Sequence, residues 1–205
     1  MKARNLELDS SARVNAQHST KSVEHYTPRT IVEAARRALG GRIDLDPASS
    51  TLANRTVGAR RIFTELDNGL AQPWHGNVLM NPPGGRLKNK SMQCVWWRKC
   101  YAEWLARRVD AVVVIAFSIE LLQNAQGGTS GELTPLDFPF CVPRKRIAFC
   151  SPDGDTVVQK TSPTHANAIV FLPNDAPGSI ELFCSAFEAI GQVVVPAAKA
   201  WSRRR

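Results

Sequence analysis

The residues of this chain best suited to chemistry are Asn81, Pro82 and Pro83, which follow the apolar run from Val78 to Met80. Consecutive prolines can continue neither a helix nor a central sheet ladder, so a strand should end at Met80 and hold Asn81 rigidly. The Asn81 side-chain oxygen can accept one hydrogen of a planar amine, and a neighbouring backbone carbonyl can accept the second. Two such acceptors would orient the nitrogen lone pair toward an electrophile and stabilise the developing positive charge. A stiff surface turn is the alternative interpretation.

Acidic residues near another expected strand end are candidates for holding a nucleoside. Asp44 and Asp46 precede Pro47 and a turn of small residues, where a carboxylate can accept hydrogen bonds from a ribose or an amino group. The turn is not G-x-G-x-x-G, so a nucleoside without a pyrophosphate fits better. In the structural alternative, one aspartate caps the turn and the other pairs with an arginine. Asp67 is a further candidate for a cofactor base, although Asp-Asn-Gly is also a common turn.

Side chains for other kinds of catalysis are scarce. The four histidines lie far apart without metal-ligand spacing, and the chain has neither a serine-centred elbow nor a P-loop. The five cysteines include no C-x-x-C pair, and their odd number favours reduced thiols in a cytoplasmic protein. We therefore expect no metal ion and no nucleophilic catalysis.

Composition and charge indicate a soluble domain with a phosphate-bearing partner. The chain has 205 residues, of which 43% are hydrophobic, and no apolar run approaches the length of a membrane span. Its net charge of +8 is consistent with DNA as the partner, and the lack of an apolar span predicts no membrane partner. Basic residues follow the proline turn and recur near residue 145. The expected DNA contacts are Gly84, Gly85, Arg86, Lys88, Lys90, Trp96, Arg144 and Arg146.

The first half of the chain alternates between helix and strand patterns. Residues 1–22 are polar and should be mobile, whereas Thr27 is suited to cap a helix that begins at Pro28 and ends at Gly40. Further elements are predicted by periodicity: strands over 43–46, 61–63, 77–80 and 111–117, helices over 52–57 and 91–108, and a flexible basic loop over 84–91. This alternation predicts an α/β fold with a mostly parallel sheet and right-handed crossovers.

The second half is richer in strand patterns. Strands are expected over 147–150, 168–172 and 193–195, a helix over 179–190 and a loop over 127–137. On the helix over 91–108, Trp97, Tyr101 and Trp104 share one apolar face and Trp96 points off it. No linker divides the chain, so one domain should cover 23–200 before a basic tail at 201–205.

Several short motifs, taken in order, resemble a known family. They are Tyr26-Thr27-Pro28, the segment from Asp44 to Ser49, Asn54, the turn from Asp67 to Leu70 with Trp74, and Asn81-Pro82-Pro83. This order and spacing resemble the phage-type DNA N-6-adenine methyltransferases over residues 24–105. The resemblance extends more weakly, through residues 144–149, toward residue 172.

The resemblance implies a Rossmann-like methyltransferase fold with helices on both faces of the sheet. It also implies S-adenosylmethionine as the cofactor and the exocyclic amine of adenine in DNA as the acceptor. Asn81, Pro82 and Pro83 would hold that amine, and the base would be flipped out of a duplex or met in a single strand. A phage or prophage origin is expected from the resemblance alone. The cofactor would be bound by Tyr26, Thr27, Pro28, Asp44, Asp46, Pro47 and Asp67.

Two positions depart from the family pattern. The family usually has an aromatic residue after the two prolines that stacks on the target base, and this chain has Gly84 there. Stacking would then come from Trp96 or Trp97, or the site would accept a different base. Asn68 stands where the family often has a second acidic residue. Two other functions stay open: methylation of another planar amine, in cytosine or in a protein glutamine, and DNA binding without catalysis.

Overall fold

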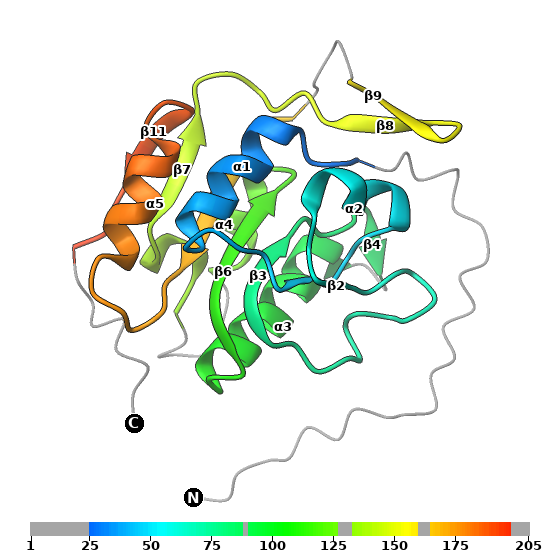
Figure 1. The fold of residues 1–205 in the computed structure, drawn as a ribbon. Helices are drawn as coiled ribbons and strands as arrows, with labels where there is room; N and C mark the ends of the chain where they lie inside the picture. Colours follow the sequence, from blue (N-terminus) through cyan, green and yellow to red (C-terminus); the bar gives the residue numbers. More distant parts are fainter. Residues whose placement is uncertain (1–24, 88–89, 127–132, 160–164, 198–205) are drawn as a thin grey trace, which may run out of the picture.

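The computed structural model describes residues 25–87, 90–126, 133–159 and 165–197. These residues form three layers, with helices on both faces of a seven-stranded sheet (Figure 1). Within these ranges, no helix has both the length and the apolar character that a membrane crossing requires. The expected mobile segment at 1–22 and the basic tail at 201–205 lie outside the described residues.

The sheet is mixed, and most of its strands run in one direction. Four strands pair in parallel in the spatial order β2 (Arg61–Ile62), β1 (Leu45–Asp46), β3 (Gly76–Met80) and β6 (Val109–Ala116). Beyond β6 the neighbours are antiparallel, in the order β10 (Ala168–Leu172), β7 (Phe140–Pro143) and β11 (Gly191–Val194). Only β10 and β11 run against the rest, so the expectation of a mostly parallel α/β sheet is confirmed.

One face of the sheet is covered by α1 (Arg29–Ala38), α2 (Thr51–Val57) and α5 (Ser179–Phe187). Alternate residues of the central strands, such as Val113 and Ile115, point into this layer and are fully buried. From α5, Phe183 stacks on Phe171 of β10 with ring centroids 5.0 Å apart. Burial of these apolar side chains is the main force that holds the helices against the sheet.

The opposite face is covered by α3 (Met92–Leu105) and α4 (Glu120–Asn124). The residues of β6 that alternate with the first set, including Val112 and Val114, pack into this second core. Because β6 is covered on both faces, it is apolar along nearly its whole length, as its valine-rich sequence predicts.

Two sequence-based predictions about the helices are wrong. Pro28, and not Thr27, is the residue before the first turn of α1, and no side chain caps that helix. On α3 the buried face contains Gln93, Trp96, Trp97, Cys100, Glu103 and Trp104, so the expectation that Trp96 points away from the core is wrong. The polar Glu103 is tolerated on this face because Lys99 and Arg108 both bind its carboxylate.

The structure also contains two β-hairpins that were not predicted from the sequence. The expected basic loop over 84–91 contains two short antiparallel strands, β4 (Arg86–Leu87) and β5 (Lys90–Ser91). The strand expected over 147–150 instead begins at its last residue, where β8 (Cys150–Asp153) pairs with β9 (Thr156–Gln159). A short 3-10 helix, η1 (Pro135–Asp137), lies within the loop expected over 127–137.

Candidate functional site at the carboxyl edge of the parallel strands

Asp46 and Asn81 lie at the carboxyl ends of neighbouring strands. β1 and β3 pair in parallel with Leu45 opposite Val78, so both strands leave the sheet at the same edge. The arrowheads of β6 and β7 point to this edge, at the top of the view in Figure 1. Ligands of open α/β sheets bind at such an edge. Asp46 and Asn81 therefore lie at the same edge of the sheet.

Asn81 is held in one orientation by the segment that precedes α1. Its side-chain Nδ2 donates a hydrogen bond of 2.6 Å to the backbone carbonyl of His25. The side chain is partly exposed, whereas Pro82 is buried and Pro83 is exposed. Because the NH2 end of the amide binds the protein, the oxygen Oδ1 is the end that the side chain can offer to an amine.

The segment from His25 to Pro28 joins several parts of this edge. Tyr26 exchanges two backbone hydrogen bonds with Cys150, of 2.8 and 2.9 Å, which tie the segment to β8. The Tyr26 hydroxyl accepts a hydrogen bond of 3.2 Å from Ser50, and the Ser50 hydroxyl also caps α2. Thr27 and Pro28 are buried. This segment therefore fixes the position of His25, and with it the orientation of Asn81.

Asp46 is a buried carboxylate without a cation. Only 4% of the residue is exposed, and its Oδ1 accepts a hydrogen bond of 3.2 Å from the Ala48 N–H. Burial raises the pKa of this carboxyl to about 6, although hydrogen bonding by the Ser49 side chain and the Ala48 N–H favours the charged form. Among the residues that the structure describes, no lysine or arginine forms an ion pair with it. The neighbouring Pro47 is also buried.

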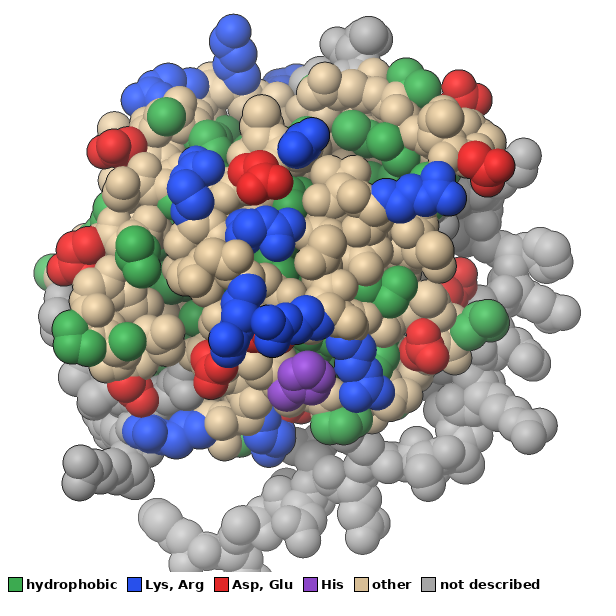
Figure 2. Space-filling model, in the orientation of Figure 1, with side chains coloured by type: hydrophobic (Ala, Val, Ile, Leu, Met, Phe, Trp, Pro, Cys, Tyr) green, Lys and Arg blue, Asp and Glu red, His purple; other side chains and the backbone are tan. Residues whose placement is uncertain are grey.

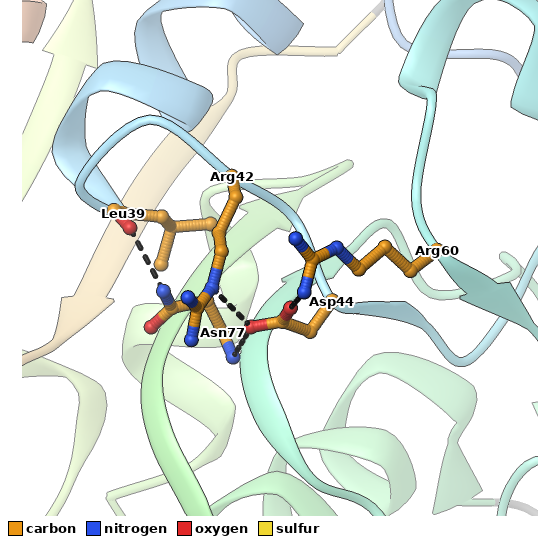
Figure 3. A network of polar contacts seen from close by, with 5 residues as sticks. All are labelled: Leu39, Arg42, Asp44, Arg60 and Asn77. Atoms are coloured by element: carbon orange, nitrogen blue, oxygen red, sulfur yellow. Dashed lines mark hydrogen bonds and ion pairs between the residues drawn. The ribbon is translucent and has the colours of Figure 1, made fainter.

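Asp44, two residues earlier, has different surroundings (Figure 3). Its carboxylate accepts hydrogen bonds from Arg42 at 3.1 Å, from Arg60 at 3.4 Å and from the Asn77 N–H at 2.9 Å. Burial opposes ionisation of this group, but these bonds and the two positive charges outweigh it and lower its pKa.

The structural alternative raised from the sequence therefore describes both aspartates. Asp46 caps a turn, and Asp44 pairs with arginines at the amino end of the strands. The expectation that Asp44 and Asp46 face one cofactor is thereby corrected, because the Asp44 carboxylate is engaged at the opposite end of β1 by three groups of the protein.

The loop from Asp67 to Leu70 packs directly on the end of β1. Gly69 is buried, and a Cβ atom built on it would lie 2.0 Å from the backbone oxygen of Pro47. Only a glycine permits this approach. Asp67 itself is exposed, and hydrogen bonds from the Thr64 hydroxyl and N–H lower its pKa. The structure thus places the loop beside Asp46, while the Asp67 carboxylate closes its own turn.

The expected DNA contacts divide into three groups. Gly84, Gly85, Arg86 and Lys90 are exposed on or beside the β4–β5 hairpin that follows the proline turn, and Lys88 lies outside the described residues. Arg144 and Arg146 are exposed just after β7, whose carboxyl end lies at the same edge. Trp96 is only 5% exposed and stacks on Trp74, so its expected contact with DNA is not supported: the indole fills the core.

Positive charge is not confined to this edge. Figure 2 shows lysine and arginine side chains spread over the face that α1 and α2 cover. Several of them are engaged by the protein itself, because Arg36 donates to the Val57 carbonyl, and Arg42 and Arg60 bind Asp44. The charge distribution alone therefore does not identify one nucleic-acid surface.

A cluster of four aromatic rings at the edge was missed by the sequence reasoning. Phe117 directly follows β6, and its ring stacks on His25 with centroids 4.7 Å apart. His165 lies against Phe117 at 4.6 Å, and Phe149 lies within 6 Å of both His25 and Phe117. The sequence signal for this aromatic cluster is weak: Phe117 is an aromatic residue at the end of a buried strand.

Asn167 fixes the end of β6 from the other side. This residue is only 3% exposed, its Nδ2 donates to the Phe117 carbonyl at 2.6 Å, and its Oδ1 accepts from the Ile147 N–H at 2.8 Å. The bonds connect the strand end to the segment that follows β7. Phe117 is therefore positioned by buried polar contacts, as the backbone beside a binding site needs to be.

Comparisons with known proteins identify no relative of this chain. No protein-family model, no curated protein and no solved structure matches the chain. Over the described ranges, no group of three or more His, Cys, Asp and Glu side chains could hold a metal ion. What the edge offers is an oriented amide oxygen, a buried carboxylate and a set of aromatic rings.

Proposed function

We propose that this protein transfers a methyl group from S-adenosylmethionine to the exocyclic amine of adenine in DNA. The observation that carries the proposal is the placement of Asn81 and Asp46 at the same end of neighbouring parallel strands. Asn81 supplies an oriented hydrogen-bond acceptor, and Asp46 supplies a carboxylate that hydrogen-bond donors of a ligand would stabilise. The resemblance to the phage-type DNA N-6-adenine methyltransferases supports the same assignment of these two residues.

Asn81 would act on the acceptor amine. Its Nδ2 bond to His25 holds the side chain so that Oδ1 can accept one amine hydrogen, and the Pro82 carbonyl is a suitable acceptor for the other. When bound, S-adenosylmethionine would supply an electrophilic methyl group to this nitrogen, with its sulfur as the leaving group. As positive charge develops on the nitrogen, the two acceptors stabilise it, and the excess proton then leaves to solvent.

Asp46 fits the cofactor on chemical grounds. A buried carboxylate that lacks a cation costs stability, and ribose hydroxyls or an amino group would supply the hydrogen-bond donors that favour its charged form. Tyr26, Thr27, Pro28, Pro47 and Asp67 would complete the proposed cofactor site, as the resemblance implies. Asp44 is left out, because Arg42, Arg60 and Asn77 already engage it.

The architecture of the sheet is consistent with this function. Five strands run in one direction, helices cover both faces, and the proposed site lies at the carboxyl edge. This arrangement is consistent with a Rossmann-like methyltransferase, whose ligands bind at that edge. The β4–β5 hairpin would bring Arg86 and Lys90 to the phosphate backbone of DNA next to Asn81.

The direct test supplies isotopically labelled S-adenosylmethionine with duplex DNA, single-stranded DNA and protein in parallel. After digestion to nucleosides, we expect label in N6-methyladenine from one or both DNA substrates. Label in a methylated cytosine or in a protein glutamine would replace adenine as the acceptor. DNA binding without any uptake of label or affinity for the cofactor would show that the protein is a non-catalytic DNA-binding protein.

A further inference from the structure

We propose that the rings of His25 and Phe117 form the surface on which the target base stacks. This inference rests on the proposed function for the identity of the ligand, a planar nucleobase. It assigns to residues 25 and 117 the role that an aromatic side chain after the two prolines would have. Gly84 occupies that position here, so the surface must come from another part of the chain.

Gly84 leaves a gap in the site. A Cβ atom built on it meets nothing within 4 Å, and no positive φ constrains this residue. The position is thus open both in space and in backbone conformation. A base held by Asn81 would therefore find no ring at position 84.

The tryptophans of α3 cannot fill the gap. Trp96 and Trp97 are 5% and 3% exposed, and both pack in the core beneath the sheet. Exposing either ring would require the N-terminal half of α3 to leave the sheet. The stacking surface must therefore be formed by rings that are already accessible at the edge.

His25 and Phe117 meet this requirement. Both residues are partly exposed, and their rings stack with centroids 4.7 Å apart and an angle of 29° between the planes. The same His25 provides the carbonyl that binds the Asn81 Nδ2. His25 thus connects the amide that would hold the amine to the pair of rings that would hold the base.

The pair is also held firmly in place. Phe149, only 4% exposed, packs against both rings from the core side, and Asn167 binds the Phe117 carbonyl. His165 is exposed and lies against Phe117 at 4.6 Å. A base can therefore stack on a fixed surface, with little loss of side-chain freedom on binding.

The test uses a single-stranded oligonucleotide of adenines with 2-aminopurine at alternate positions. Stacking on an aromatic ring quenches 2-aminopurine emission, and a single strand removes the need for base flipping. We expect the wild-type protein to quench the emission on binding. Phe117→Leu and His25→Ala should each reduce the quenching and weaken binding by about tenfold, within the range for loss of one stacking contact.

Two further variants control this experiment. Tyr101→Leu removes a partly exposed ring from α3, far from Asn81 in the fold, and should change neither quenching nor affinity. Gly84→Tyr, combined with Phe117→Leu, supplies a ring at the open position and should restore quenching. His25→Ala alters a partly exposed side chain and provides a second measurement if Phe117→Leu does not fold.

The outcomes separate this inference from the proposed function. Unchanged quenching and affinity in folded Phe117→Leu and His25→Ala, or no quenching by the wild type, would overturn the inference even if the protein methylates adenine. Quenching that depends on Phe117, in a protein that transfers no methyl group to DNA, would support the base surface and reject the methyltransferase.

Discussion

The two ends of β1 and β3 use the same residue types in different ways. At the amino end, Asp44 is bound by two arginines and a backbone N–H, and Asn77 donates its side-chain Nδ2 to the Leu39 carbonyl. At the carboxyl end, Asp46 is buried, is hydrogen-bonded by Ser49 and the Ala48 N–H, and has no cation among the described residues. Asn81, like Asn77, donates its Nδ2 to a backbone carbonyl. Asp44 can therefore serve as a control for Asp46, and Asn77 can serve as a control for Asn81.

The difference separates stability from activity. Closed polar networks such as the one at Asp44 contribute to folding because every charge has a partner. The buried carboxylate of Asp46 lowers stability when charged, which is expected of a group that waits for a ligand. Substitutions at the amino end should therefore affect unfolding, and substitutions at the carboxyl end should affect binding and turnover.

The largest expected difference lies between Asn81→Ala and Asn77→Ala. Loss of the Asn81 oxygen should lower kcat by about 100- to 1000-fold, because one preorganised stabilising contact is removed, while cofactor affinity changes little. Asn77→Ala should leave kcat unchanged and lower the free energy of unfolding by about 1 kcal/mol. Steady-state kinetics and urea unfolding measure both. Equal losses of kcat would mean that Asn81 has only a structural role.

The second comparison is between the two aspartates. Asp46→Asn should weaken S-adenosylmethionine binding by about tenfold or more, since hydrogen bonds to a charged acceptor are lost. Asp44→Asn should leave the Kd within about twofold and lower the Tm, because Arg42 and Arg60 would lose their counter-charge. Titration calorimetry gives both Kd values. If Asp44→Asn alone weakens cofactor binding, the site lies at the amino end of the strands.

The same pair should give opposite dependences of stability on pH. The pKa of Asp46 is raised from 3.8 to about 6 in the folded protein, so the folded state binds its proton more tightly and stability falls as pH rises through that range. Asp46→Asn should therefore be more stable than the wild type at pH 7.5, by about 3 kcal/mol, and lose this advantage below pH 4.

Asp44 has the opposite sign. Its pKa is lowered on folding, so its contribution is present above the unfolded pKa and is lost as pH falls through the folded one. Asp44→Asn should therefore be destabilised near neutral pH and approach wild-type stability in acid. Urea unfolding at several pH values distinguishes the two aspartates. Parallel pH profiles for both variants would contradict the difference in their surroundings.

The smallest expected effect concerns DNA affinity. Neutralising Arg86, Lys88 and Lys90 together should reduce the slope of log affinity against log salt by at most about 3, since each phosphate contact contributes about 0.9. Arg107→Gln changes a basic residue before β6, at the amino edge, and should leave the slope unaltered. Binding titrations at several salt concentrations measure this. An unchanged slope in the triple variant would place DNA on another surface, such as the basic face over α1 and α2.

Local chemistry made some features of this molecule predictable. The prolines after Asn81 end β3 whatever the position of that strand in the sheet. The valine-rich run over 111–117 is typical of a strand covered on both faces. The β8–β9 hairpin could also have been found, because Gly154-Asp155 is a common two-residue hairpin turn and Gly154 has φ of 56°. The Trp96 error has a physical reason: Gln93 and Glu103 made the true buried face of α3 look polar, and only Lys99 and Arg108 allow Glu103 to lie there.

The site itself depends on contacts that no local pattern contains. The His25–Phe117 pair joins residues 92 positions apart, and the Asn81 anchor joins residues 56 positions apart. Likewise, which aspartate meets arginines depends on where Arg60 returns beside β1. Sequence reasoning could name Asp44 and Asp46 as candidates, but only the fold assigns them to different ends of the sheet.

Gly69 carries a consequence for any attempt to redesign this protein. Its missing side chain lets two separate loops touch backbone to backbone, so the smallest possible enlargement, Gly69→Ala, forces a methyl group into the Pro47 oxygen. Because the clash is with a backbone atom, the loop from Asp67 to Leu70 would have to move away from Pro47 as a whole. A single added carbon at an apparently neutral turn would thus open the proposed cofactor site to solvent without altering any residue that binds there.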